Sequence, residues 1–170
     1  NGIPVVSGTT GWLDQKSALD KLCLENDGTF FYASNFSIGV NLFFELNKKL
    51  AQMINDFNEY GGSIEEIHHT KKKDEPSGTA ITLAEGIINN VEGVEGWALG
   101  KRESNVIPIY SKREVDEPGT HAFIYSSEID NIEIKLTAHS RQGFAKGALM
   151  VAMWIVGKKG VLGMSDFLKN

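Results

Sequence analysis

Residues 64–80 read IEEIHHTKKKDEPSGTA, and the order of residue types in this stretch predicts three consecutive elements. Residues 64–69 are typical of a short β-strand, and the polar residues that follow predict a loop. Apolar residues then recur at helical spacing from Ala80 onward, so a helix is expected to begin near Ser77 or Thr79. Either hydroxyl can cap that helix by accepting an N–H group of its first turn.

The same stretch gathers groups that attract an anion. Two imidazoles (His68, His69) and three ammonium groups (Lys71 to Lys73) lie within six residues, although the chain as a whole carries a net charge of -5. A helix N-terminus adds unpaired N–H groups and a partial positive charge. Gly78 lets a ligand come close to the backbone, because glycine has no side chain. The combination favours a site for a small anion.

Each of these features also has an ordinary structural interpretation. A run of lysines is usually a solvated loop, paired histidines at a strand end are more often structural than catalytic, and Ser-Gly-Thr at a helix start is usually a cap alone. A metal site is not favoured, because the chain has no His-Glu-x-x-His sequence and Cys23 is its only cysteine. The convergence of cations, hydroxyls and a helix start is what favours the functional interpretation.

Composition argues against several classes of protein. The chain has 170 residues, of which 41% are hydrophobic, enough to fill a core. Its acidic balance argues against general nucleic-acid binding. A single cysteine excludes a disulfide framework and suits the cytoplasm, where thiols stay reduced. No apolar run reaches the roughly 20 residues of a membrane helix, and neither a signal peptide nor a membrane partner is expected.

The first 34 residues predict a β-turn-α-β arrangement that is typical of the later part of a nucleotide-binding sheet. Residues 3–7 and 29–33 have strand patterns, and residues 14–25 are weakly helical. The turn at residues 8–11 lacks the G-x-G-x-x-G fingerprint of dinucleotide sites, which occurs nowhere in the chain. Because the first strand would otherwise have no sheet neighbour, we expect further chain ahead of Asn1.

The rest of the chain alternates helical and strand patterns. A helix with apolar residues from Val40 to Phe57 is expected to stop at Gly61-Gly62, and residues 92–105 show no clear pattern. The remaining strands and helix are expected at residues 106–112, 122–127, 132–138 and 144–156, with a short final turn from Ser165.

Four segments together resemble one enzyme family. The stretch IHHTKKKDEPSGTA (67–80) resembles the signature His-His-x-x-Lys-x-Asp-x-Pro-Ser-Gly-Thr-Ala of dihydrodipicolinate reductases, with every fixed position filled. The other three segments follow in the family's order: SGTTGW (7–12), ASNFSIGVN (33–41) and HSRQGFAKGAL (139–149). The chain departs from the family at Glu75, at the shorter region between Val91 and His121 with Pro108 and Glu114, and in having no Gly-rich loop of the nucleotide-binding type.

This resemblance implies a fold and an activity. The implied fold is α/β. A partial Rossmann-like nucleotide-binding domain is formed by residues 1–34 and 141–170, and a substrate-binding and oligomerisation domain with a mixed or antiparallel sheet by residues 35–140. The implied activity is the reduction, by NADH or NADPH, of the cyclic dicarboxylate that dihydrodipicolinate synthase makes. It gives tetrahydrodipicolinate in the diaminopimelate route to lysine. The family further implies a homotetramer in the cytoplasm.

The resemblance also implies roles for single residues. Lys72 matches the general acid and His68 its acid/base partner, while the substrate-binding positions are matched by His69, Ser77, Gly78 and Thr79. The cofactor-binding positions are matched by Gly8, Thr9, Thr10, Ala33, Ser34, Asn35, Phe36 and Arg141. Cations around Lys72 would destabilise its ammonium and make it a better proton donor. Asp74 is expected to orient the loop, and Lys71 and Lys73 to remain solvated.

Two other functions remain open. The chain could bind a dicarboxylate or assemble subunits without turning over, because it has no phosphate-binding loop of the usual kind. A dehydrogenase of similar two-lobed plan, such as homoserine dehydrogenase, would need a different lysine/aspartate arrangement. The complete His-His-x-x-Lys and Pro-Ser-Gly-Thr motifs argue against that second alternative.

Overall fold

The computed structural model describes residues 2–169 and divides the chain into two compact units. The first unit consists of Asn1–Leu42 and Arg141–Asn170, and the second of Phe43–Ser140. The later division, at Arg141, coincides with the one expected from the sequence, whereas the earlier one lies inside α2 (Ile38–Ile54) rather than after residue 34. No helix among the described residues is long and apolar enough to cross a membrane.

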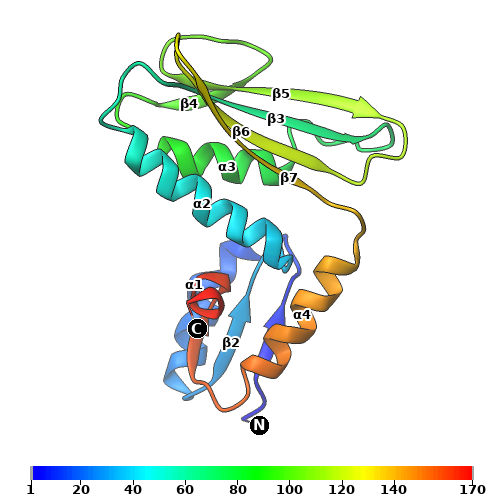
Figure 1. Cartoon of the computed structure of the whole chain (residues 1–170). Coiled ribbons are helices and arrows are strands. Elements are labelled where there is room, and N and C mark those ends of the chain that lie inside the picture. Colours follow the sequence, from blue (N-terminus) through cyan, green and yellow to red (C-terminus); the bar gives the residue numbers. More distant parts are fainter. Residues whose placement is uncertain (1, 170) are drawn as a thin grey trace. The chain divides into compact units, whose positions relative to one another are not determined.

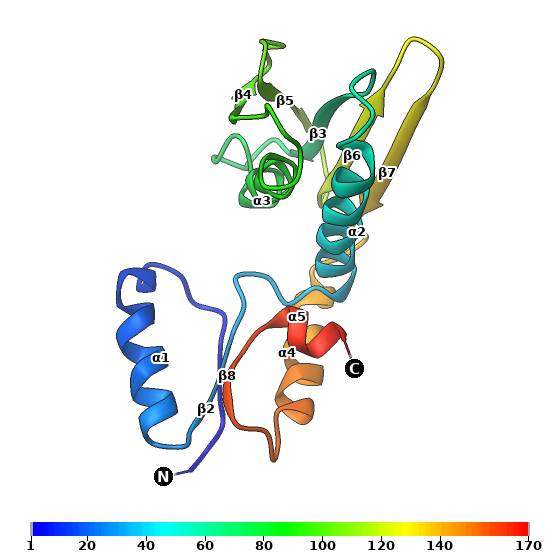
Figure 2. The same cartoon turned by 90° about the vertical axis from the view of Figure 1, so that its left-hand side faces the viewer.

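The first unit is a small parallel sheet with helices on both sides. Its strands lie in the order β1 (Val5–Ser7), β2 (Thr29–Tyr32) and β8 (Gly160–Leu162), with parallel pairing throughout. Figure 2 shows α1 (Lys16–Glu25) on one side of this sheet and α4 (Gln142–Trp154) with α5 (Met164–Leu168) on the other. A short 3-10 helix, Leu13–Gln15, leads into α1. The arrangement is that of an open α/β sheet.

The core of the first unit lies between β2 and α4. It consists of Phe31, Ala33, Phe36, Val151, Ile155 and Met164. Helix α4 comes very close to the chain after β2, because a Cβ atom at Gly147 would overlap the carbonyl group of Phe36. Gly147 is therefore required for this contact, and the glycine of the FAKGAL motif is explained by packing.

The second unit is a five-stranded mixed sheet. Its strands lie in the order β4 (Gly96–Leu99), β5 (Val106–Glu114), β3 (Gly61–His69), β6 (Thr120–Ser126) and β7 (Asn131–Thr137). The β4–β5 and β5–β3 pairs are parallel, and the β3–β6 and β6–β7 pairs are antiparallel. Figure 1 shows α2 and α3 (Gly78–Ile88) on the same face of this sheet. The mixed sheet expected for the substrate domain is confirmed.

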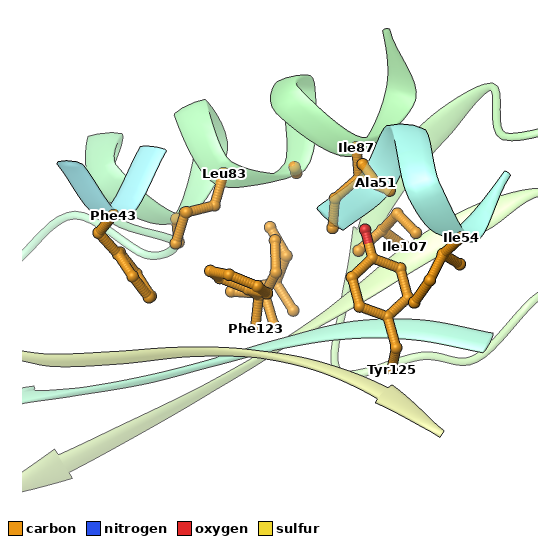
Figure 3. Packing of buried hydrophobic residues seen from close by; sticks show 12 residues of the cluster. Phe43, Ala51, Ile54, Leu83, Ile87, Ile107, Phe123 and Tyr125 are labelled. Carbon is orange, nitrogen blue, oxygen red and sulfur yellow. The ribbon is translucent and has the colours of Figure 1, made fainter. Parts of the chain in front are cut away.

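The core of the second unit fills the space between the two helices and the sheet. Figure 3 shows Phe123 and Tyr125 of β6 pointing toward Leu83 and Ile87 of α3. The full cluster consists of Phe43, Ala51, Ile54, Ile64, Ala80, Leu83, Ala84, Ile87, Ile107, Ile109, Phe123 and Tyr125. The rings of Phe43 and Phe123 are 4.9 Å apart between centroids, so α2 is held to β6 by an aromatic contact.

The structure differs from the sequence expectations at Gly61-Gly62 and in two short strands. Helix α2 ends at Ile54, and Gly61 and Gly62 begin β3 instead of stopping the helix. At Gly62 a Cβ atom would lie 3.3 Å from side-chain atoms of both Ile107 and Tyr125, so glycine there relieves crowding inside the sheet. The strands β4 and β8 were missed, because each has only three or four residues, and β8 pairs with β2, which is far away in sequence.

We predict that Gly147→Ala destabilises the chain by at least about 2 kcal/mol, because the added methyl group collides with backbone that cannot rotate away. Gly143→Ala is the matched control in the same helix. Its nearest neighbour, Ser37 Oγ at 3.6 Å, leaves ordinary space, and alanine favours a helix over glycine by up to about 1 kcal/mol. Urea unfolding followed by tryptophan fluorescence measures both changes, and equal stability of the two variants would contradict the packing argument.

Candidate active site

Three neighbouring strands of the second unit change from apolar to polar side chains at the same level. Ile64 of β3 is paired with Ile109 of β5 and with Phe123 of β6. Two residues further along β3, Glu66 is paired with Ser111 and with His121. Because side chains alternate along a strand, both levels face the helices. The apolar core is therefore followed directly by a buried polar row.

Glu66 is fully buried at the centre of this polar row. Its carboxylate accepts hydrogen bonds from the Ser111 hydroxyl at 2.7 Å and from the backbone N–H of Ser77 at 3.1 and 3.2 Å. His121 Nε2 and Arg113 Nη1 each lie 3.7 Å from it. Burial alone would raise the pKa of Glu66, but hydrogen bonds from His121, Ser77 and Ser111 outweigh it and lower this pKa to about 2. The carboxylate is therefore ionised under physiological conditions.

His68 and His121 lie beside this carboxylate with their rings edge to face. Their ring centroids are 4.8 Å apart, and His68 Nδ1 lies 3.5 Å from Glu66 Oε2. Burial lowers the pKa of His68, and electrostatic interactions with His121, Lys72 and Arg113 lower it further. Glu66 opposes them, and the result is about 4. His68 is thus a neutral imidazole at neutral pH, with a lone pair that can take up a proton.

Ser77 joins the polar row to the start of α3. Its Oγ accepts a hydrogen bond from the N–H of Ala80 at 3.2 Å. Of the two residues that the sequence offered as the helix cap, Ser77 and Thr79, the cap is therefore Ser77. The same Oγ lies 3.1 Å from His121 Nε2. The helix itself offers no acceptor for the N–H groups of Gly78 and Thr79. Gly78 is exposed, with open space where a side chain would be. These two donors therefore suit a carboxylate.

Lys72 is held by the loop that connects β3 to α3. Its Nζ donates to both oxygens of Asp74, at 2.7 and 2.8 Å, and this hydrogen bond lowers the pKa of Asp74. Arg113 in turn donates to the backbone carbonyl of Asp74 at 2.9 Å. The Asp74 carboxylate is a partner for Lys72 that the sequence analysis did not include. Asp74 orients the loop as expected, and Lys71 and Lys73 are exposed.

Four residues of this arrangement were given no role in the sequence analysis: Glu66, Ser111, Arg113 and His121. Glu66 lies in the stretch that decides the fold, but Glu65 beside it is indistinguishable in the sequence. The other three are 45 to 55 residues away from Glu66 along the chain and meet it only through the strand register. His69 ends β3 half-buried, and its Nδ1 has no hydrogen-bond partner among the described residues.

The residues expected to bind the cofactor lie together in the first unit. Gly8, Thr9 and Thr10 follow β1, and residues 33–36 follow β2. These strands are adjacent and parallel, so both loops lie at the carboxyl edge of the sheet, where open α/β sheets bind their ligands. A Cβ atom at Gly8 would lie 2.9 Å from the Phe36 ring, which shows how closely the loops pack. Arg141 precedes α4, whose Gly143 lies beside Ser37.

Residues 39–168 match the sequence model of a family described as "Dihydrodipicolinate reductase, C-terminus". The chain belongs to the dihydrodipicolinate reductase family. Two similar relatives are called 4-hydroxy-tetrahydrodipicolinate reductase. The one from Christiangramia forsetii is 52% identical over 170 residues, and the one from Methanosarcina barkeri is 36% identical over 173 residues. The resemblance drawn from the four sequence motifs is confirmed.

These relatives are longer than the chain. The alignments include 100% and 98% of the chain, but only 71% of the Christiangramia protein and 64% of the Methanosarcina protein. A solved structure, the dipicolinate-bound dihydrodipicolinate reductase from Paenisporosarcina sp. TG-14, has the same fold with a TM-score of 0.72 at 24% identity. That match covers 93% of this chain and 62% of the other one. The expected α/β fold class is confirmed.

We predict that acid destabilises the chain through His68. The pKa of His68 is about 4 in the folded chain against an ordinary 6.5, so only the unfolded chain binds this proton between those values. Stability contributed by the neutral imidazole is complete above pH 6.5 and falls by about 3 kcal/mol on acidification toward pH 4. Urea unfolding between pH 4 and 7 should show a shallower slope for His68→Gln than for the unsubstituted chain. Equal slopes would contradict the burial of a neutral His68.

Proposed function

We propose that the protein to which this chain belongs reduces the cyclic dicarboxylate made by dihydrodipicolinate synthase to tetrahydrodipicolinate, using NADH or NADPH. The observation that carries the proposal is the start of α3. There the N–H groups of Gly78 and Thr79 come at the end of the loop that contains Lys72, and this loop follows the strand that contains His68. Such an arrangement suits a carboxylate with proton-transferring groups near it. The reaction belongs to lysine biosynthesis by the diaminopimelate route.

In this proposal the helix start binds one carboxylate of the substrate. The N–H groups of Gly78 and Thr79, together with the Thr79 hydroxyl, donate hydrogen bonds to it, and His69 and Lys72 add positive charge or further donors. Ser77 is only 3% exposed, and its N–H is already donated to Glu66. Its contribution is to hold the helix start in place, with its hydroxyl as the innermost polar group of the site.

Lys72 is the proposed proton donor. Its ammonium donates to Asp74, and a substrate carboxylate would compete with Asp74 for these hydrogen bonds. His68 is the proposed partner, because its buried neutral imidazole has a lone pair that can accept a proton. The cations of the loop also stabilise negative charge that develops on the substrate ring.

A nicotinamide cofactor, when bound, supplies the hydride. In this proposal the residues that hold it are those of the first unit. Gly8, Thr9 and Thr10 present backbone at the carboxyl edge of β1, and Ala33, Ser34, Asn35 and Phe36 do the same beside β2. Asn35 is preorganised, since its Oδ1 accepts the N–H of Ser37 and its carbonyl accepts from Asn41 Nδ2. Arg141 adds a cation for the charged cofactor. The position of both loops at the carboxyl edge of a parallel sheet supports the proposal.

We also propose that the protein is a homotetramer of the cytoplasm. The face of the second unit's sheet opposite α2 and α3 carries half-buried side chains such as Ser63, Glu65 and Ile67 without a helix of that unit over them (Figure 1). Such a face suits packing against other copies, and light scattering measures the number of chains in the particle. The lone Cys23 is a free thiol, which suits a reducing compartment.

Calorimetric titration with pyridine-2,6-dicarboxylate tests the substrate site. We expect the chain to bind this planar dicarboxylate, and Lys72→Ala to weaken the binding at least about tenfold through loss of a charged hydrogen bond. Lys73→Ala is the matched control, because Lys73 is exposed and an exposed charge contributes little. Absence of binding to the unsubstituted chain, or equal losses in both variants, would contradict the proposed site.

Steady-state kinetics of the full-length protein separates the two sets of residues. Lys72→Ala should lower kcat at least about a hundredfold with little change in the KM for the nicotinamide cofactor, because proton transfer is lost. Arg141→Ala should instead raise the cofactor KM with a smaller change in kcat. If neither full-length variant differs from the parent, the alternative of a binding protein without turnover gains support.

A further inference from the structure

We propose that Glu66 and His121 are positioning residues of this site, which act from beneath α3 on Ser77 and His68 without touching the substrate. The proposal rests on the proposed function, because it assigns the groups that hold the dicarboxylate and proton-transfer residues in place. It is carried by geometry: one buried carboxylate connects the helix start, both flanking strands and the two imidazoles.

The Glu66 carboxylate is hydrogen-bonded to two elements besides its own strand. Glu66 belongs to β3, and its carboxylate accepts from Ser111 of β5 and from the backbone of Ser77 at the start of α3. The N–H that it accepts is the one immediately before those of Gly78 and Thr79. The direction of the Ser77 N–H therefore sets the direction of the next two donors, and a shift of Glu66 shifts the carboxylate site with it.

His121 connects the same carboxylate to the cap. Its Nε2 lies 3.1 Å from Ser77 Oγ and 3.7 Å from Glu66 Oε2, while its ring meets His68 edge to face. An anion near Nε2 favours the tautomer with its proton on that nitrogen. In that tautomer Nε2–H points at Ser77 Oγ, which also accepts from Ala80. The hydroxyl hydrogen of Ser77 is then left to donate elsewhere.

Glu66 also opposes the cations that face His68. Those cations come from three other elements: Lys72 from the loop, Arg113 from β5 and, when protonated, His121 from β6. Each disfavours a proton on His68, and Glu66 on the same strand as His68 favours it. Glu66 therefore raises the pKa of His68 above the value that burial and these cations alone would give.

A merely structural role does not explain the charge. Two residues earlier on β3, Ile64 faces Ile109 and Phe123 and builds a core from apolar side chains alone. Burying an ion instead costs free energy that its hydrogen bonds must offset, and apolar replacements of buried ion pairs are often no less stable. The carboxylate at position 66 is therefore explained by its effect on Ser77 and His68.

A bound metal ion is the competing explanation for two imidazoles and a carboxylate. Donor atoms of Glu66, His68 and His121 all lie within 4.8 Å of one another. However, Glu66 already accepts from Ser77 and Ser111, and the guanidinium of Arg113 lies 3.7 Å from it. A divalent cation would have to displace these donors and face a fixed positive charge. The positioning role is therefore favoured.

Glu66→Gln and Glu65→Gln test the proposal as a matched pair. The two residues are adjacent on β3 but face opposite sides of the sheet, and Glu65 is partly exposed with only a distant Lys112 partner at 3.9 Å. Circular dichroism confirms that each variant folds. Titration with pyridine-2,6-dicarboxylate should give binding at least about tenfold weaker for Glu66→Gln and within about twofold of the parent for Glu65→Gln. Equal affinity of the two variants overturns the proposal.

A second readout needs no ligand. NMR titration of the His68 ring should give a lower pKa in Glu66→Gln than in the parent and a higher one in His121→Gln, because the two neighbours act with opposite sign. Loss of packing alone would shift the His68 pKa in the same direction in both variants. His121→Gln keeps an N–H near Ser77, so it tests the charge of His121 if Glu66→Gln does not fold. A His68 pKa unchanged in the folded variants overturns the proposal.

The two readouts separate this inference from the proposed function. If the parent chain binds no dicarboxylate, the proposed function fails, whereas binding that Glu66→Gln leaves intact refutes only the positioning role. Titration with Zn²⁺ completes the test: absence of stoichiometric binding is expected. Binding of one Zn²⁺ per chain that disappears in Glu66→Gln would replace the positioning role by a metal site.

Discussion

A carboxylate taken out of water costs several kcal/mol unless donors surround it, and Glu66 sits without solvent contact in the middle of a five-stranded sheet. The donors that offset this cost come from β5, β6 and the start of α3. None of these elements can shift without leaving the charge unpaired. The register of three strands and the position of one helix end therefore depend on each other through a single side chain.

That dependence explains how the site is placed at the edge of a conventional core. Toward the start of β3 the sheet is covered by apolar side chains of α2 and α3, shown in Figure 3, and the strands are held by ordinary packing. Toward the end of β3 the same three strands carry Glu66, His68, Ser111, Arg113 and His121. The polar row lies where α3 begins, so the first N–H groups of the helix lie next to the side chains that hold Ser77.

The candidate active site was only partly predictable from the sequence. The motif from His68 to Thr79 is local, so its loop, its cap at Ser77 and the start of its helix could be predicted from neighbouring residues. The ion pair of Lys72 with Asp74 is equally local, yet it was missed, because a run of three lysines suggests repulsion before it suggests a partner. The sequence did not indicate Ser111, Arg113 and His121 as site residues, because polar residues at the same spacing are also common on ordinary protein surfaces.

By itself the amino-acid sequence determined the family, the α/β class and most helices and strands, because these depend on contiguous motifs and on hydrophobic periodicity within one element. The alternation in Gly61–His69 left open which of Glu65 and Glu66 faces the core, since both follow Ile64 in a short strand. Only the tertiary structure decided that Glu66 is buried against Ser111 and His121. Strand register is set by side chains on three separate strands packing together, and no single stretch of sequence contains that information.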